Sequence, residues 1–367
     1  MSRVLLLIKG LGRGGAEQLL AGAARHADRS RFDYEVAYLL PWKDALVKEL
    51  HDEGVGVHCL DGAGGIGWVL RLRRLVDRRG ITLVHSHSPV AAVGARMALD
   101  GTRVRHIYTE HNVWERYHRA TYWSNMLTFT RSDHVFAVSE HVRDSIRYPT
   151  WLRRRHLPPI ETLFHGIDPA AVEGWTRVDG VRKELGISDD APVIGAVANL
   201  KAHKRLDRLI QAMPEIRDRV PGVRLVLVGQ GPMEDELRAL SRRLQLGETV
   251  LFTGFREDAP RIASCFDVFA LSSEQEGLSI ALIEALALGK PAVVTRVGGL
   301  AEVVEDGRQG FVVSADDPAA LTDPLVTLLQ DEGLRLRMGG EARERARDFD
   351  IRKAVRRIEQ VYEELLA

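Results

Sequence analysis

The chain has 367 residues, 45% of them hydrophobic and 28% charged, and its formal net charge is zero. This length favours two domains, and the composition is that of an ordinary soluble globular protein. The two cysteines, Cys59 and Cys265, lie far apart without CxxC spacing, so neither a disulfide scaffold nor a zinc site is indicated. Apolar runs are too short for a membrane span, and Val4–Ile8 is too short for a signal-peptide core, which predicts a cytoplasmic protein.

Charge is spread unevenly along the chain. Residues 1–170 carry a net charge of +6 and hold 12 of the 13 histidines, whereas residues 171–367 carry −6. One interpretation is that this uneven distribution of charge arose by chance. The other is a basic amino-terminal half that meets an anionic acceptor or the anionic inner face of the plasma membrane, with no nucleic acid involved.

The amino-terminal segment reads as strand, glycine loop and helix. A strand at 4–8 leads into a loop that satisfies G-x-G-x-x-G with Gly10, Gly12 and Gly15, and a helix follows at 16–27. This pattern opens a doubly wound α/β domain. An NAD-dependent dehydrogenase also requires an acid at the end of the second strand. That strand, Tyr34–Leu40, continues into Pro41 and Trp42, so the motif is weak evidence for NAD.

Further α/β units follow in the amino-terminal half. We expect helices at 43–53, 66–79 and 139–147, and strands at 55–60, 81–85, 104–109, 134–138 and 161–164. His85 and His87 lie where a strand ends, at the edge where open sheets bind ligands. No carboxylate or cysteine cluster accompanies them, which favours a polar cleft rim over a metal site. His111 follows the strand at 104–109, and one interpretation is that it is a rim residue without chemistry.

A stretch rich in aromatic and basic residues comes next. It contains Trp114, Arg116, Tyr117, His118, Arg119, Tyr122 and Trp123, and the run Trp151 to Arg155 could extend it. Rings at the headgroup level beside arginines suit a membrane-surface patch or an acceptor site. An ordinary solvated basic face is the equal alternative.

The carboxy-terminal half repeats the α/β pattern. We expect a helix at 180–185, strands at 192–197, 223–228, 250–252, 266–270, 292–295 and 310–313, and a last helix at 351–366. Its most informative stretch is 272–295. Residues 278–288 form a helix that is apolar on nearly every side and therefore buried. It holds Glu284 in its middle and has Glu276 just before its first turn.

The start of this helix suits a ligand that carries hydroxyls and phosphates. Gly277, Leu278 and Ser279 would present backbone N–H groups at the positive end of the helix dipole. Glu284 could accept hydrogen bonds from a ribose diol, and Glu276 from sugar hydroxyls. The alternative is a buried helix with one of these glutamates in a structural salt bridge and the other as an ordinary first-turn charge.

The text EGLSIALIEALALGKPAVV, with Glu276 and Glu284 eight residues apart, resembles the hallmark of the retaining glycosyltransferases of family 4, which have the GT-B fold. Leu278 and Ser279 replace the usual Phe-Gly. The resemblance implies two Rossmann-like doubly wound domains that face each other across a cleft. Residues 1–168 would form the acceptor-side domain and 169–350 the nucleotide-sugar domain, with a helix at 351–367 that crosses back onto the first.

The resemblance also implies roles for individual residues. His165-Gly166-Ile167-Asp168 is similar to the Asn-Gly-Ile-Asp of the interdomain hinge. His111, Lys204 and Glu276 would be catalytic. The donor would be bound by Gly14, Gly15, Asn199, Lys204, Phe255, Gly277, Leu278, Ser279 and Glu284. Asn199 stands where the family has an arginine, and Lys201 or Arg205 are candidates to replace that charge. No metal and no cofactor besides the substrate are expected.

The resemblance therefore predicts transfer of a hexose from a UDP- or GDP-sugar to a glycan, lipid-linked or small-molecule acceptor. A bacterial polysaccharide or glycolipid pathway fits this reaction. Two alternatives share the fold, namely a nucleotide-sugar 2-epimerase and a non-catalytic nucleotide-sugar-binding subunit.

Overall fold

A computed structural model describes residues 1–12, 14–62, 65–148, 157–177 and 180–367. The chain forms two compact units: unit 1 comprises Met1–Gly166 and Ile351–Ala367, and unit 2 comprises Ile167–Asp350. The sequence placed the boundary two residues later. The residues 151 and 153–155 of the aromatic and basic stretch lie outside the described residues. Among the described helices, none has the length and apolar character that a bilayer crossing requires.

Unit 1 is a seven-stranded parallel sheet with helices on both faces. Its strands are β1 (Ser2–Ile8), β2 (Phe32–Tyr38), β3 (Gly56–Cys59), β4 (Leu83–Ser86), β5 (Arg105–Glu110), β6 (His134–Ala137) and β7 (Ile160–Thr162). Its α-helices are α1 (Gly15–His26), α2 (Val47–Asp52), α3 (Gly67–Arg79), α4 (Pro89–Ala98), α5 (Arg119–Thr128), α6 (Glu140–Ser145) and α16 (Ile351–Leu366). The strand order β3-β2-β1-β4-β5-β6-β7 reverses between β1 and β4.

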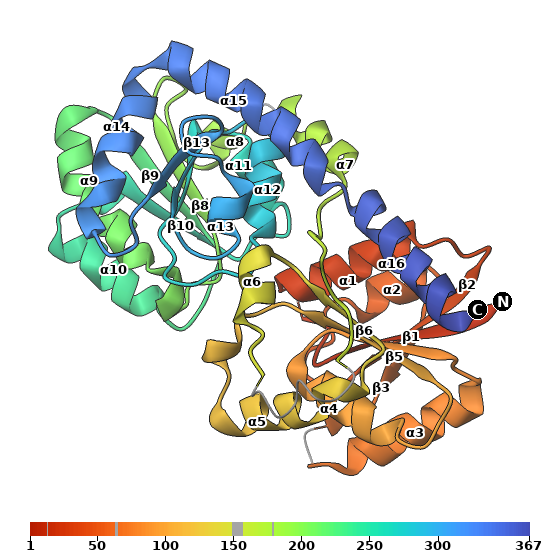
Figure 1. Cartoon of the computed structure of the whole chain (residues 1–367). Helices are drawn as coiled ribbons and strands as arrows, with labels where there is room; N and C mark the ends of the chain where they lie inside the picture. Colours follow the sequence, from red (N-terminus) through yellow and green to blue (C-terminus); the bar gives the residue numbers. More distant parts are fainter. Residues whose placement is uncertain (13, 63–64, 149–156, 178–179) are drawn as a thin grey trace. The chain divides into compact units, whose positions relative to one another are not determined.

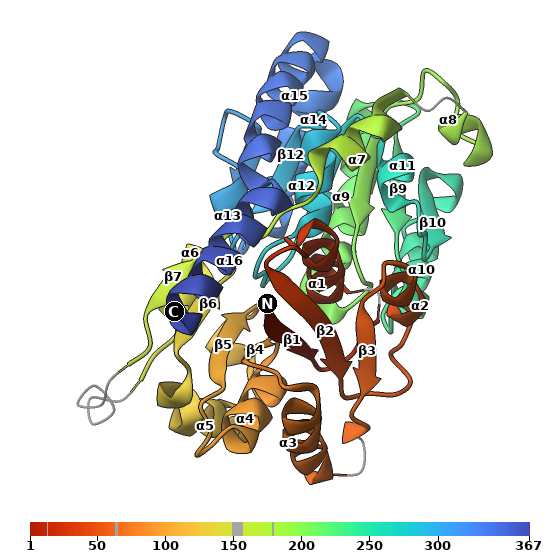
Figure 2. The same ribbon diagram turned by 90° about the vertical axis from the view of Figure 1, so that its right-hand side faces the viewer.

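The alternation of side chains along β1 explains the two helical layers of unit 1. Val4, Leu6 and Ile8 pack with α1, α2 and α16, whereas Leu5 and Leu7 pack with α3 and α4. A strand that is buried on both faces reads as a continuous apolar run, which is why the sequence located it. Figures 1 and 2 show α16 beside α1, with α3, α4 and α5 on the opposite face of the sheet.

Unit 2 has the same topology with six parallel strands. They are β8 (Val193–Val197), β9 (Arg224–Val228), β10 (Val250–Gly254), β11 (Val268–Leu271), β12 (Ala292–Thr295) and β13 (Gly310–Val313). The α-helices are α7 (Pro169–Glu173), α8 (Val181–Glu184), α9 (Leu206–Arg219), α10 (Glu234–Arg243), α11 (Ala259–Ala263), α12 (Ile280–Ala287), α13 (Leu300–Val303), α14 (Thr322–Gln330) and α15 (Glu332–Ala346). The order β10-β9-β8-β11-β12-β13 reverses between β8 and β11.

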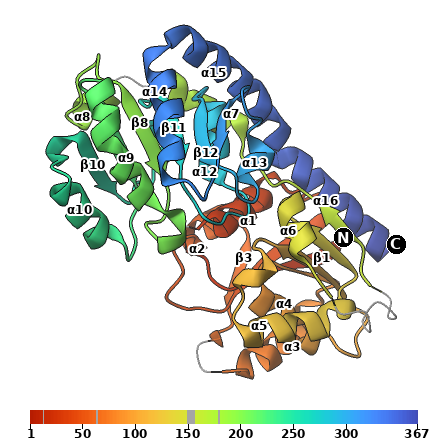
Figure 3. The ribbon, with the colours of Figure 1, turned by 60° about the vertical axis from the view of Figure 1, so that its left-hand side comes forward.

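Helices α9, α10 and α14 cover one face of the unit 2 sheet, and α11 and α12 lie on the other (Figures 1 and 3). On the second face, α12 contacts α15 most extensively and also α7 and α11. The predicted fold class, two doubly wound parallel α/β sheets, is confirmed. In such sheets ligands bind beyond the carboxyl ends of the strands where the order reverses. That rule directs attention to the loops after β1 and β4 in unit 1, and after β8 and β11 in unit 2.

One predicted helix is shorter in the structure. We expected residues 43–53 to be helical, but α2 begins only at Val47. The Leu11 N–H donates to the Lys43 carbonyl and the Leu46 N–H donates to the Leu11 carbonyl, at 2.7 and 3.0 Å. Backbone pairing with the glycine loop therefore takes the groups that a longer helix would have used.

Candidate functional site

The loops after β8 and β11 lie side by side at the reversal point of unit 2. The Ser272 side chain, which is fully buried, donates to the Arg205 carbonyl at 2.6 Å, and the Glu274 N–H donates to the His203 carbonyl at 2.9 Å. Thr295, at the end of β12, donates to the Ser273 carbonyl at 2.6 Å. These bonds join segments far apart in sequence and hold the two loops in register, and no local sequence pattern indicates them.

The held loops bring Lys204 and Glu276 together. Lys204 Nζ donates a hydrogen bond to Glu276 Oε2, and the two side chains are only 14% and 13% exposed. Ser273 Oγ lies 3.5 Å from the same oxygen. Sequence reasoning named both residues but gave them separate roles and did not anticipate the ion pair. Because the pair is shielded from water, its charges interact more strongly than a surface pair would.

Helix α12 begins directly after this pair. It starts at Ile280, and Ser279 is its N-cap, whose Oγ accepts from the Leu282 N–H at 3.3 Å. Among the described residues, no acceptor is found for the backbone N–H groups of Gly277 and Leu278. These groups add to the positive end of the helix dipole, so the loop can receive an anion.

Glu284 lies in the middle of α12 and is partly exposed between buried neighbours. Burial raises the pKa of its carboxyl group to about 7. Within the described part of the chain its side chain forms no hydrogen bond or ion pair, so of the two glutamates it is Glu276, and not Glu284, that forms a salt bridge. A carboxylate that is desolvated and has no protein partner is available to a ligand.

Two glycines, Gly298 and Gly299, shape the site. Neither was assigned to it from the sequence. Gly298 has a φ of +48°, and a Cβ there would lie 1.8 Å from the Glu276 carbonyl oxygen. A Cβ on Gly299 would lie 2.1 Å from the Gly277 carbonyl, which accepts from the Gly299 N–H at 3.0 Å. Any side chain at either position would therefore displace the loop that carries Glu276.

Lys201 and Arg205 are the two candidates for the cation expected near Asn199, and they differ in their ion pairs. Asn199 is exposed after β8. Arg205 donates to Asp207 at 3.0 Å and also to Glu274, and these carboxylates raise its pKa. Lys201 is exposed and has no ion-pair partner among the described residues. Of the two candidates, Lys201 is thus the one without a competing carboxylate among the described residues. Phe255, which follows β10, is 41% exposed.

In unit 1, His111 follows β5 inside a stack of imidazoles. Its ring centroid lies 5.5 Å from that of His87 and 5.9 Å from that of His165, and His87 lies 4.3 Å from His85. His85, His87 and His165 are at most 5% exposed, whereas His111 is partly exposed. His85 and His87, which the sequence predicted at a polar cleft rim, are therefore buried within the stack. Burial lowers the pKa of His111 well below 6.5, so its ring is neutral at neutral pH.

Glu110, next to His111, is fully buried and organises the loop after β5. Its carboxylate accepts from the Tyr108 hydroxyl at 2.6 Å, from Trp114 Nε1 at 2.9 Å, from the Asn112 N–H at 3.1 Å, and from Tyr117. Trp114 is thus a core residue, and Tyr117, which is partly buried, packs against the same core. The exposed members of the aromatic and basic stretch are His118, Arg119 and Trp123.

The glycine loop of unit 1 ends at Gly14, the N-cap of α1, and Gly15 is the first residue of that helix. A Cβ on Gly14 would lie 2.3 Å from Glu17 Oε2, so the flexible Glu17 carboxylate lies directly beside this glycine. Among the described residues, no group of three or more histidine, cysteine, aspartate or glutamate side chains could hold a metal ion.

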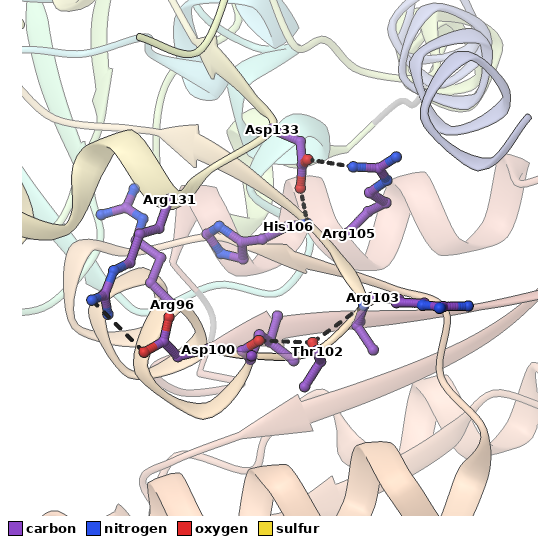
Figure 4. A pocket seen from close by; sticks show the side chains of 11 residues that line it. Arg96, Asp100, Thr102, Arg103, Arg105, His106, Arg131 and Asp133 are labelled. Atoms are coloured by element: carbon purple, nitrogen blue, oxygen red, sulfur yellow. Dashed lines mark hydrogen bonds and ion pairs between the residues drawn. The ribbon is translucent and has the colours of Figure 1, made fainter. Parts of the chain in front are cut away.

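A cavity of about 240 Å³ lies at the opposite, amino-terminal edge of the unit 1 sheet (Figure 4). Its charged lining comprises Arg96, Asp100, Arg103, Arg105, Arg131 and Asp133. Asp133 accepts from Arg105 at 3.0 Å and from the His106 N–H at 2.8 Å, and Arg131 lies 3.8 Å from Asp100. Most of these charges already pair with one another. The cavity is also at the start of β5, whereas His111 follows its end.

The predicted residues thus fall into two groups. Unit 2 brings together Lys204, Glu276 and the backbone of 277–279 at its reversal point, with Asn199 on the adjoining loop. Glu284 lies one helical turn further along α12. Unit 1 holds Gly14, Gly15 and His111.

Comparison with protein families gives matches over both halves of the chain. The model described as "Glycosyltransferase Family 4" matches residues 13–171, and the one described as "Glycosyl transferases group 1" matches residues 179–345.

Individual relatives span most of the chain. N-acetyl-alpha-D-glucosaminyl L-malate synthase of Bacillus anthracis is 29% identical over 303 residues, which cover 81% of this chain and 78% of that protein. A GDP-mannose-dependent alpha-(1-6)-phosphatidylinositol monomannoside mannosyltransferase of Mycobacterium tuberculosis is 29% identical over 375 residues, covering 94% and 93%. The solved structure of Anabaena HepE in complex with UDP and glucose superposes with a TM-score of 0.86 at 22% identity, over 99% of this chain and 100% of that one.

Proposed function

The chain belongs to glycosyltransferase family 4 and has the GT-B fold, and from that premise we propose that it transfers a hexose from a nucleoside diphosphate sugar with retention of configuration. The acceptor is a glycan, a lipid-linked sugar or a small molecule. The observation that carries the proposal is the Lys204–Glu276 ion pair at the start of α12. It places a cation, an acid and unpaired backbone donors where a doubly wound sheet binds its ligand.

The diphosphate is the group that this arrangement suits. Lys204 and the N–H groups of Gly277 and Leu278 all favour negative charge, and charge on the diphosphate grows as the sugar leaves. These fixed groups stabilise the leaving diphosphate without a metal ion. In other transferases a bound cation has this task. In the ligand-free protein Glu276 compensates Lys204. When the diphosphate takes over that task, the Glu276 carboxylate becomes free to accept hydrogen bonds from the sugar hydroxyls.

Glu284 is assigned to the ribose. An ionised carboxylate has two oxygens and can accept both hydroxyls of a vicinal diol. Its raised pKa supports this role, because desolvation without a protein partner costs free energy that hydrogen bonds from a ligand offset. Phe255 offers its exposed ring to the base, and Lys201 supplies the charge that Asn199 lacks.

His111 is assigned to the transferred sugar. Its ring is neutral and only partly buried, so it can hydrogen-bond a hydroxyl without adding charge. Gly14 and Gly15 are assigned to the donor through their backbone. The described relatives support UDP or GDP as the nucleotide, since HepE was crystallised with UDP and the mycobacterial mannosyltransferase is GDP-mannose-dependent.

The proposed setting is bacterial polysaccharide or glycolipid synthesis in the cytoplasm, with peripheral contact to the inner face of the plasma membrane. Helix α5 supports that contact, because Trp123 and Leu127 are 50% and 54% exposed on it and Arg119 is exposed at its start. Flotation with phosphatidylglycerol vesicles tests it. Binding that fails to weaken in Trp123→Ala/Leu127→Ser would exclude this surface.

A single incubation series tests the activity. The protein is incubated with UDP- and GDP-sugars, with and without acceptors and with EDTA, and products are followed by NMR. We expect an α-linked product from an α-linked donor, unaffected by EDTA. An epimer formed from donor alone indicates the 2-epimerase, and donor binding without turnover indicates a non-catalytic subunit. Binding of nicotinamide nucleotides in place of UDP- or GDP-sugars would support an NAD-dependent dehydrogenase instead.

A further inference from the structure

The imidazole stack of unit 1 contains a hydrogen bond between two histidines. His87 Nδ1 lies 3.3 Å from His111 Nε2. Burial lowers the pKa of both rings well below 6.5, so each carries one proton and one bare nitrogen. One of the two facing nitrogens must therefore be the donor, and the choice fixes the tautomer of His111.

The surroundings of His87 decide which nitrogen donates. Its other nitrogen, Nε2, is buried and has no hydrogen-bond partner among the described residues. Most of the surface of the small cavity beside it is apolar and comes from side chains such as Leu6, Leu19 and Val355. An unpaired N–H in such surroundings is rarer than an incompletely satisfied acceptor. His87 therefore carries its proton on Nδ1 and donates it to His111 Nε2.

His85 holds the His87 ring in place. The two rings lie 4.3 Å apart and are tilted by 31°. His85 is fixed on both sides, since its Nδ1 lies 2.6 Å from the Tyr362 hydroxyl and its Nε2 lies 2.7 Å from Thr109 Oγ1. Tyr362 belongs to α16, so the carboxy-terminal helix contributes to the orientation of the stack.

We propose that His87 is a positioning residue that holds His111 as its Nδ1–H tautomer and so makes Nδ1–H the group presented to the transferred sugar. This inference rests on the proposed function for the role of His111, but the tautomer itself does not. His111 Nδ1 has no hydrogen-bond partner among the described residues, and the ring is partly exposed, so the N–H is accessible. A neutral N–H in this position can donate to a sugar oxygen.

The tautomer is measured in the ligand-free protein. Histidine is labelled with 15N, the His111 signals are assigned by their loss in His111→Gln, and the protonated nitrogen is identified from long-range 15N–1H correlations. We expect a pyrrole-type Nδ1 and a pyridine-type Nε2. A protonated Nε2 overturns the inference whether or not the protein proves to be a transferase.

Two amide substitutions at His87 provide the matched kinetic test. The amide nitrogen of Asn can occupy the place of Nδ1, whereas that of Gln reaches the place of Nε2. We expect His87→Asn to keep kcat within about threefold and to preserve the His111 tautomer. His87→Gln should lower kcat about tenfold with donor KM changed less than about twofold, because alignment and not binding is lost. Equal losses in both variants, with the tautomer unchanged, would show that His87 only fills space and would overturn the positioning role.

Discussion

At the carboxyl ends of its strands, unit 1 gathers neutral hydrogen-bonding groups, whereas unit 2 gathers charges. In unit 1 His85, His87, His111 and His165 are neutral and stacked, and the Glu110 carboxylate is surrounded by hydroxyl and N–H donors. In unit 2 Lys204 pairs with Glu276, Arg205 pairs with Asp207 and Glu274, and Glu284 has no protein partner among the described residues.

The difference matches what each set of residues is proposed to hold. A diphosphate is stabilised by fixed cations and backbone N–H groups, and a ligand with full charge can compensate for their desolvation. Sugar hydroxyls are neutral, and a neutral imidazole can bond them without the cost of burying an unpaired charge. The two sheets share one strand order but differ in how their polar residues respond to pH, salt and substitution.

Removal of the cation in unit 2 should have the largest effect. We expect Lys204→Met to lower kcat/KM about 100-fold, roughly 2.7 kcal/mol, because a preorganised charge opposite the leaving diphosphate is lost. Lys183→Met, at an exposed lysine of α8, is the control and should stay within about twofold. Steady-state kinetics of both variants checks this. Near-normal turnover in Lys204→Met would contradict the proposal that unit 2 stabilises the leaving diphosphate by charge.

Mild acid should destabilise unit 1 selectively. Burial lowers the pKa of His165 to about 4, whereas the ordinary value is 6.5. Between these values the unfolded chain binds more protons than the folded one, so stability falls as pH drops. Integration from pH 7.5 to 5 gives roughly 2 kcal/mol for this histidine.

Hydrogen exchange at the two pH values measures this effect separately in each unit. Amides of β1 and β4 should lose protection at pH 5, while those of β8 and β12 change less, since unit 2 contains a single histidine, His203. His165→Asn should reduce the pH dependence of unit 1. Equal loss of protection in both sheets would contradict the proposed difference in pH response between the two units.

Glu284 should make nucleotide binding depend on pH. With a pKa of about 7, its carboxyl is largely protonated at pH 6 and ionised at pH 8. If only the ionised form accepts the diol, affinity falls about tenfold, roughly 1.4 kcal/mol, over that range. Because the nucleotide phosphate titrates nearby, the informative quantity is the difference from Glu284→Gln in calorimetry with UDP and GDP. If the nucleotide affinities of the wild type and of Glu284→Gln change with pH in the same way, Glu284 does not bind the ribose.

The smallest predicted effect concerns the anchor of the imidazole stack. Tyr362→Phe leaves His85 Nδ1 without its hydroxyl partner and should cost about 1 kcal/mol of unfolding free energy. Tyr122→Phe is the control, because no partner of the Tyr122 hydroxyl is found in the described ranges. Denaturant titration followed by a unit 1 probe compares them. An unchanged midpoint in Tyr362→Phe would show that α16 does not hold the stack through this bond.

The strands were predictable because buried parallel strands are continuous apolar runs. Those at Ala292–Thr295 and Gly310–Val313 lie where the sequence placed them. The position of α12 was predictable because its run is apolar on nearly every side. Both signals are local.

What the sequence could not supply are contacts between distant segments. Nothing local indicates that Glu276 pairs with Lys204, 72 residues away, or that Gly298 must lack a side chain to clear the Glu276 carbonyl. Trp114 and Tyr117 read as a surface patch because composition cannot reveal that Glu110 lies within their reach. His85 likewise bonds Tyr362 of α16, which comes from the far end of the chain.

The most direct test of the account is an experimental structure of the protein with a nucleoside diphosphate, chosen from UDP and GDP by binding. We expect the diphosphate within hydrogen-bond distance of Lys204 Nζ and of the Gly277 or Leu278 N–H, and the ribose hydroxyls on Glu284. A nucleotide bound elsewhere, for example among Arg96, Arg103 and Arg131 at the other edge of unit 1, with Lys204 still paired to Glu276, would contradict it.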